Sequence, residues 1–172
     1  TPTAQRINQA LANRATHPVP FIAETGGQNA MIVDSTALPE QVVRDVLRSA
    51  FASAGQRCSA LRVLFVQEDI AERVISLITG AMQELKVGIP HLHNTDVGPV
   101  IDANAKQKLL AHIGEMTRNQ RKVAQLSLDA DCEHGDFVPP CAFEIDNIHC
   151  LAQEHFGPIL HIVRFKADQL PQ

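Results

Sequence analysis

The sequence predicts an α/β protein built around a mostly parallel sheet. Segments of helical periodicity alternate with short runs of β-branched and other apolar residues along most of the chain. The chain has 172 residues, of which 45% are hydrophobic, and this is enough to bury one substantial core. No internal repeat or low-complexity linker interrupts the alternation. These features favour one compact domain, or a piece of a larger one.

The N-terminal part predicts one helix and two strands. Residues 3–14 place apolar side chains at helical spacing. The runs at 19–24 and 29–34 are rich in strand-forming residues, and the turn-like sequence TGGQ separates them. We therefore expect a sharp glycine bend, with Glu24 at the end of the first strand.

The middle of the chain predicts a helix, a strand and a second helix. The helix over 34–55 opens with the capping sequence Asp-Ser-Thr, and Gly55 stops it. An apolar strand over 60–67 follows, and then an amphipathic helix over 69–85 with Asp69 as its N-cap. This order is typical of a parallel α/β sheet.

The C-terminal part predicts a loop rich in proline and glycine over 87–102 and a helix over 103–120. Three short strands follow, at 122–127, 137–145 and 159–165. A proline pair inside the second of these strands predicts that it is an edge strand or is bent.

Composition and charge exclude two classes of function. The net charge of −4 and the absence of Trp and Tyr provide neither a basic surface nor stacking rings for nucleic acid. No apolar run approaches the roughly 18–20 residues that span a bilayer, and the first residues contain no signal-peptide segment. We expect a cytoplasmic protein that acts on a small molecule, with no nucleic-acid or membrane partner.

The four cysteines have no CxxC spacing, so we expect reduced thiols rather than a disulfide framework or a zinc ribbon. His91 with His93, and Cys132 with His134, resemble fragments of a metal site, but neither pair has further ligands at a suitable spacing. We therefore predict no bound metal.

Cys58 is the first candidate for chemistry, because it lies in a glycine-containing turn between a predicted helix and a predicted strand. Backbone N–H groups are free at such a junction and can hold a developing oxyanion, while the adjacent Arg57 can help electrostatically. The alternative is a buried packing cysteine, which is the commoner use of this residue.

Glu24 is the second candidate, because Gly26 and Gly27 follow it and let the backbone approach a ligand closely. If a thiol forms an acyl intermediate, this carboxylate can activate the water that hydrolyses it. The alternative is a solvated glutamate at a strand end.

Three segments together resemble the aldehyde dehydrogenase superfamily. They are ETGGQNAMIV at 24–33, GQRCSALR at 55–62 and QEHFGPILHIVRF at 153–165, in the family's order. Thr25 and Gln28 replace the superfamily's common Leu and Lys, and this makes the chain similar to the L-glutamate γ-semialdehyde (1-pyrroline-5-carboxylate) dehydrogenase branch found in bifunctional proline-utilisation proteins.

The resemblance implies a role for each candidate. Cys58 would be the nucleophile that forms a thiohemiacetal and then a thioester, NAD would take the hydride, and Glu24 would activate the hydrolytic water. Ser59 would lie near the substrate carboxylate, with Arg57 beside it.

The same resemblance assigns cofactor contacts to four residues. Glu154 would bind the nicotinamide ribose hydroxyls, and Phe156 would pack beside them. Gly26, with the neighbouring Thr25, would form the backbone next to the nicotinamide.

The resemblance also implies a three-layer αβα catalytic domain with an incomplete dinucleotide-binding domain. Residues 1–24 would be the last piece of the NAD-binding domain, 25–155 the catalytic domain and 156–172 a return segment toward the NAD-binding domain. We expect a fragment of a homo-oligomeric parent, which would use FAD only if it also carries a proline dehydrogenase domain. We expect the 172-residue chain alone to be inactive, because it lacks the family's pyrophosphate loop.

Three other functions stay open at this point. One is another semialdehyde dehydrogenase, and a second is a coenzyme A acylating relative, which has no need of a water-activating residue such as Glu24. The third is a non-catalytic module for packing or assembly, for which an unreactive Cys58 would speak.

Overall fold

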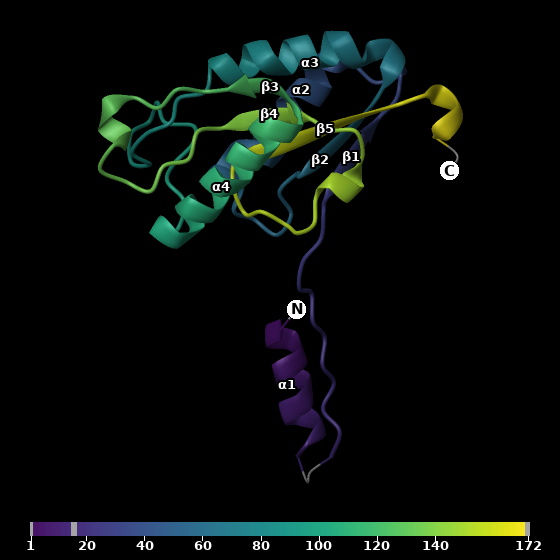
Figure 1. Ribbon diagram of the computed structural model, residues 1–172, viewed down its shortest axis with the longest axis vertical. Coiled ribbons are helices and arrows are strands. Elements are labelled where there is room, and N and C mark those ends of the chain that lie inside the picture. Colours follow the sequence, from purple (N-terminus) through teal and green to yellow (C-terminus); the bar gives the residue numbers. More distant parts are fainter. Residues whose placement is uncertain (1, 15–16, 171–172) are drawn as a thin grey trace.

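Five strands form one sheet, in the order β1-β2-β5-β4-β3, in the computed structural model, which describes residues 2–14 and 17–170 (Figure 1). Strands β1, β2, β5 and β4 are parallel, and β3 pairs antiparallel with β4 at the edge. The strands are β1 (Ala30–Val33), β2 (Val63–Gln67), β3 (Arg121–Gln125), β4 (Cys141–Glu144) and β5 (Ile159–Phe165). The predicted α/β class with a mostly parallel sheet is confirmed.

Three of the four α-helices in the described residues cover this sheet. Helices α2 and α3 pack against each other on one side of the sheet, and α4 lies on the other side, which makes three layers (Figure 1). Helix α1 projects away from the sheet and buries none of its residues. The helices are α1 (Pro2–Ala12), α2 (Pro39–Phe51), α3 (Glu68–Gln83) and α4 (Ala103–Asn119).

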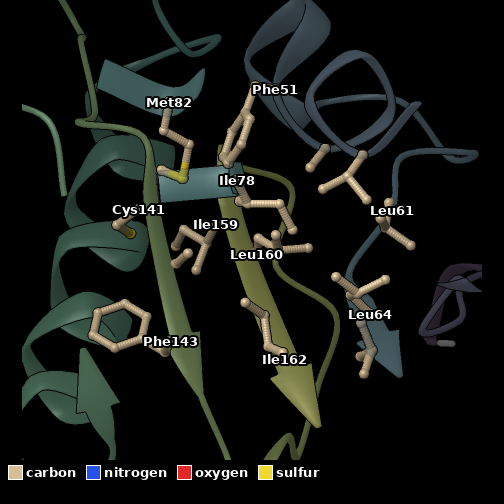
Figure 2. Close-up of a cluster of buried hydrophobic side chains, with 14 of the residues drawn as sticks. Phe51, Leu61, Leu64, Ile78, Met82, Cys141, Phe143, Ile159, Leu160 and Ile162 are labelled. Atoms are coloured by element: carbon tan, nitrogen blue, oxygen red, sulfur yellow. The ribbon is translucent and has the colours of Figure 1, made fainter. Parts of the chain in front are cut away.

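The core lies between the sheet and the paired helices. Figure 2 shows Phe51 of α2 and Ile78 and Met82 of α3 gathered over Ile159 and Leu160 of β5, and all five side chains are buried. Burying one such side chain contributes about 1.5–3 kcal/mol. The central strand β5 therefore anchors the helical layer.

Helix α4 reaches the sheet through a buried histidine pair. His112 Nε2 lies 3.0 Å from His161 Nε2 of β5, and His161 Nδ1 lies 3.1 Å from the carbonyl oxygen of Arg62, which precedes β2. Since a carbonyl oxygen only accepts, the arrangement implies that His161 Nδ1 carries its hydrogen and that His112 Nε2 donates to His161 Nε2. This contact joins α4, β5 and the start of β2.

Both histidines of this pair are held neutral. Burial lowers the pKa of His112 to about 3 and that of His161 to about 4. Desolvation penalises the charged imidazolium, and nearby histidines add to the effect.

The predicted strand over 19–24 is wrong. Residues 17–29 contain no strand and run from the projecting helix to the sheet (Figure 1). Pro18 and Pro20 remove two backbone donors, and within the described residues no neighbouring strand pairs with this segment. Glu24 therefore does not lie at a strand end.

Two predicted helix caps are also wrong. Helix α2 begins at Pro39, and Asp34 instead closes a turn by accepting hydrogen bonds from Thr36 N (2.9 Å) and Thr36 Oγ1 (2.6 Å). Helix α3 begins at Glu68, one residue before Asp69, whose carboxylate accepts from the Gln67 side chain at 2.6 Å. In both cases a local side-chain hydrogen bond takes the place of the cap.

The proline pair of the 137–145 segment precedes β4, which is an interior strand between β5 and β3 rather than an edge strand. Within the expected return segment over 156–172, β5 pairs with β2 and β4 in the middle of the sheet. Its residues supply backbone hydrogen bonds to both neighbours, so this part of the chain belongs to the sheet.

No helix among the described residues has the length and apolarity needed to cross a bilayer.

We predict that His112→Leu weakens the pH dependence of stability. The pKa of His112 is about 3 in the folded state, against about 6.5 when unfolded, so between these values the unfolded chain binds one more proton. The free energy of unfolding therefore falls as the pH is lowered through this window, by about 1.4 kcal/mol per pH unit for this group. In His112→Leu the slope of the unfolding free energy against pH should be smaller by the contribution of close to one proton.

Urea unfolding at several pH values between about 4.5 and 6 measures this slope. Met116→Leu is the matched control, because Met116 is buried on the same helix and does not titrate. Equal slopes for His112→Leu and the unsubstituted protein would contradict the prediction.

Candidate active site

Cys58 lies on an exposed loop between the short 3-10 turn Ala52–Gly55 and β2. Asn29, which precedes β1, holds this loop: its Nδ2 donates to the carbonyl oxygens of Cys58 at 2.6 Å and Ala60 at 2.9 Å. In the described part of the chain the Cys58 thiol itself has no hydrogen-bond partner. The loop backbone is thus fixed, while the sulfur is accessible.

The turn before this loop has an unusual backbone. Ser53, Ala54 and Gly55 all have positive φ, at 56°, 52° and 64°. A Cβ at Gly55 would collide with the carbonyl oxygen of Gly157. Glycine is therefore required here, because the Cys58 loop passes directly against residues 154–158, which form a Glu-x-Phe-Gly-Pro segment.

Arg62 is the buried centre of the site, with only 1% of its surface exposed. Its guanidinium donates through Nη1 to the carbonyl oxygen of Gly55 at 2.6 Å and through Nη2 to that of Arg57 at 3.2 Å. Both acceptors belong to the segment that carries Cys58. The guanidinium therefore fixes the backbone of this loop through two hydrogen bonds.

The same guanidinium also meets the Glu-x-Phe-Gly-Pro segment. Nη2 lies 3.4 Å from Glu154 Oε1, and the guanidinium carbon lies 4.9 Å from the centre of the Phe156 ring. Burial lowers the pKa of Arg62, and the Glu154 carboxylate opposes that shift. An arginine stays protonated, so Glu154 and Phe156 both face a buried positive charge.

The glycine-rich segment completes the cluster. Gly27 N donates to the second oxygen of Glu154, Oε2, at 3.2 Å, and Gln28 Nε2 donates to the carbonyl oxygen of Gln153 at 2.8 Å. Gly26 has a φ of 148°, and a Cβ there would lie 3.2 Å from Glu154 Oε2. All three segments that were singled out from the sequence thus meet within one cluster.

Glu24 and Thr25 are exposed, and neither side chain makes a hydrogen bond within residues 2–14 and 17–170. The structure therefore brings the neighbouring Gly26 and Gly27 to Glu154 but leaves the Glu24 carboxylate free. No hydrogen bond links Glu24 to Cys58 among the described residues.

Ser59 and Arg57 line an open pocket of about 260 Å³ beside α2. Arg57 Nη2 donates to the carbonyl oxygen of Arg48 at 3.1 Å, so its guanidinium is directed toward the helix. The remaining lining residues are Met31, Asp45, Arg48 and Ser49.

Sequence reasoning missed three residues that build this site, namely Asn29, Gln56 and Arg62. Gln56 accepts a hydrogen bond from Ile101 N at 2.7 Å and donates to the carbonyl oxygen of Pro99 at 3.3 Å, which ties the loop over 87–102 to the Cys58 loop. For Arg62 a signal was present, because it is the only charged residue in the apolar run ALRVLFV. A charge in a buried strand requires a partner.

Comparison with known proteins agrees with this geometry. The model of the aldehyde dehydrogenase family matches residues 1–169. The bifunctional protein PutA of Klebsiella aerogenes is 50% identical, over 99% of this chain and 14% of PutA. The 1-pyrroline-5-carboxylate dehydrogenase of Geobacillus kaustophilus is 34% identical, over 81% of this chain and 27% of that enzyme.

Solved structures show the same relation. A crystal structure of a PutA mutant from Bradyrhizobium japonicum has a TM-score of 0.92 at 52% identity, and the match covers 99% of this chain and 17% of that one. The chain thus spans about one seventh of the length of PutA from Klebsiella aerogenes. The matching sheet, the three converging segments and the family match lead to one conclusion: the chain belongs to the aldehyde dehydrogenase family.

Proposed function

We propose that the protein containing this chain oxidises L-glutamate γ-semialdehyde to L-glutamate with NAD, the second step of proline catabolism. The observation that carries this proposal is the meeting of the Cys58 loop, the glycine-rich segment and the Glu154 segment around Arg62. The choice of substrate is supported by the likeness to PutA and to 1-pyrroline-5-carboxylate dehydrogenase.

Cys58 is the proposed nucleophile. Its thiolate attacks the aldehyde carbon, an S–C bond forms, and the carbonyl oxygen takes the negative charge. The backbone N–H groups of Cys58 and Ser59 have no backbone acceptor among the described residues, so they are free to bind this oxyanion. Loss of hydride from the same carbon then leaves a thioester on Cys58.

Glu154 and Phe156 are the proposed cofactor contacts. NAD supplies the hydride acceptor when it is bound. The Glu154 carboxylate uses one oxygen toward Arg62 and the other toward Gly27 N, which leaves lone pairs for ribose hydroxyls. Phe156 is 44% exposed and offers an apolar face beside them. Gly26 and Thr25 supply the adjacent backbone.

Glu24 is the proposed general base. Its exposed carboxylate, with no hydrogen-bond partner in the described structure, is available to take a proton from water. The water oxygen attacks the thioester carbon, and the Cys58 thiolate leaves. The products are a carboxylate, NADH and two protons.

Ser59 and Arg57 are the proposed contacts for the substrate carboxylate. The pocket beside them also contains Arg48 and Asp45, so two guanidinium groups and one carboxylate line it and leave an excess of positive charge. A carboxylate at the far end of the semialdehyde suits this charge. Ser59 supplies a hydroxyl donor next to the nucleophile.

Residues 1–24 are proposed to be part of the NAD-binding domain. Helix α1 and the segment after it expose the large hydrophobic residues Ile7, Val19, Phe21 and Ile22, of which Ile22 is 87% exposed. These side chains suit burial against the rest of that domain in the parent protein. Residues 25–155 are proposed to form the catalytic domain, and residues 156–172 the return segment toward the NAD-binding domain.

We predict that Cys58→Ala in the full-length protein lowers NADH formation from 1-pyrroline-5-carboxylate by about 10³-fold or more, because no thiohemiacetal can form. The measurement is NADH absorbance under saturating substrate. Cys150→Ala is the matched control, since Cys150 is a partly buried thiol outside the site, and it should keep its activity. Full activity in Cys58→Ala would disprove thiol catalysis. If the unsubstituted protein oxidised another aldehyde but not 1-pyrroline-5-carboxylate, the proposed substrate would be wrong, while the proposed role of Cys58 would stand.

We predict that Glu24→Gln slows turnover by about 10²–10⁴-fold but preserves a rapid first release of NADH. The thioester still forms in this variant, while its hydrolysis lacks a base. Stopped-flow absorbance should show a burst close to one NADH per Cys58, followed by a slow phase. Glu68→Gln, an exposed glutamate on α3, is the control. An unchanged steady-state rate in Glu24→Gln would show that another group activates the water.

A further inference from the structure

The backbone of Arg62 is fixed by its own hydrogen bonds, which are separate from the contacts of the side chain. Its N–H donates to the carbonyl oxygen of Asn29 at 3.0 Å, and its carbonyl oxygen accepts from His161 N at 2.9 Å. The same oxygen also receives His161 Nδ1 at 3.1 Å. Because Asn29, just before β1, and His161 of β5 thus fix the backbone of Arg62, the guanidinium has a defined origin.

The guanidinium then joins segments that are far apart in the sequence. It binds the carbonyl oxygens of Gly55 and Arg57 on the loop of Cys58, and it faces Glu154 and Phe156 on the proposed cofactor side. A planar donor group can satisfy these partners only when they lie at matching positions. The arginine therefore specifies the spacing between the two sides of the site.

Stability alone does not account for a charged residue at this position. A buried ion pair is often no more stabilising than well-packed apolar side chains of the same volume. The Glu154 contact is long, at 3.4 Å, and Arg62 Nε is buried without a hydrogen-bond partner in the described structure. The gain from this arginine thus lies in the geometry of its partners.

We propose that Arg62 is a positioning residue, which sets Glu154 and Phe156 at the correct place for the cofactor relative to the Cys58 loop. This inference rests on the proposed function. Arg62 acts through Glu154. The Oε1 atom of Glu154 faces Arg62, and its Oε2 atom is thereby turned to Gly27 N.

The test uses Arg62→Met, Arg62→Lys, Glu154→Gln and the double variant Arg62→Met/Glu154→Gln in the full-length protein. The dissociation constant of NAD is measured by calorimetry, and kcat and KM are measured separately. Arg164→Met is the matched control, because Arg164 is a partly buried arginine on β5 whose ion pairs are with Glu144 and Glu72.

We expect Arg62→Met to weaken NAD binding about tenfold, and Arg62→Lys to recover only part of the loss, since an ammonium cannot span the same partners. The KM for NAD should rise more than kcat falls. The double variant should bind NAD no more weakly than Glu154→Gln, because the arginine acts through that carboxylate. Arg164→Met should leave NAD binding unchanged even where it lowers the melting temperature.

Two results would overturn the proposal: NAD binding within twofold of the unsubstituted protein in Arg62→Met, or losses that multiply in the double variant. A second readout is independent of NAD, namely the rate at which iodoacetamide alkylates Cys58, followed by mass spectrometry. Arg62→Met should change this rate at least fivefold and Arg164→Met should not, because only Arg62 holds the loop. If the unsubstituted protein bound no NAD, the proposed function would fail, and an unchanged alkylation rate would refute the loop-holding role of Arg62 independently.

Discussion

The buried charge of Arg62 is the constraint on which the arrangement of this site depends. A guanidinium that is 1% exposed costs several kcal/mol to desolvate unless its donors are satisfied. Two backbone carbonyls, one carboxylate and one aromatic ring face it. These partners come from separate loops, so the folded state that satisfies the charge also assembles the site.

The same residue connects the site to the interior of the sheet. Its carbonyl oxygen receives His161, and His161 in turn accepts from His112 of α4. A continuous polar path thus runs from Glu154 through Arg62 and His161 to α4. Because both histidines are neutral at neutral pH, this path adds no further charge to the interior.

Rigid support and the groups proposed to react are separated in this structure. Arg62, Asn29 and Gly55 are packed and hydrogen-bonded, while Cys58 and Glu24 stand in exposed segments with unpartnered side chains in the described residues. Loops on a rigid scaffold commonly carry chemistry in this way. The projecting helix α1 and the segment after it carry exposed apolar side chains outside this sheet.

Much of the fold could be predicted from local patterns. The apolar periodicity of α2, α3 and α4 and the β-rich run at 159–165 were enough to place these elements, because each depends on neighbouring residues. The prediction of a strand at 19–24 was wrong, because a strand also needs a neighbouring strand to pair with. The prolines and the position of this segment prevent such pairing. The caps were wrong because Asp34 and Asp69 bind side chains nearby, a choice that depends on loop geometry.

For the site, the sequence by itself indicated the residues proposed to react and the three segments that carry them, since the proposed nucleophile, the proposed base and the glycine turns lie in short local motifs. Only the tertiary structure decided that these segments meet at Arg62, that β5 lies in the middle of the sheet and that Asn29 and Gln56 hold the loops. The physical reason is that the groups that bind a buried charge come from segments that are distant from one another in the sequence. Their positions exist only after the sheet has formed and its strands are in register.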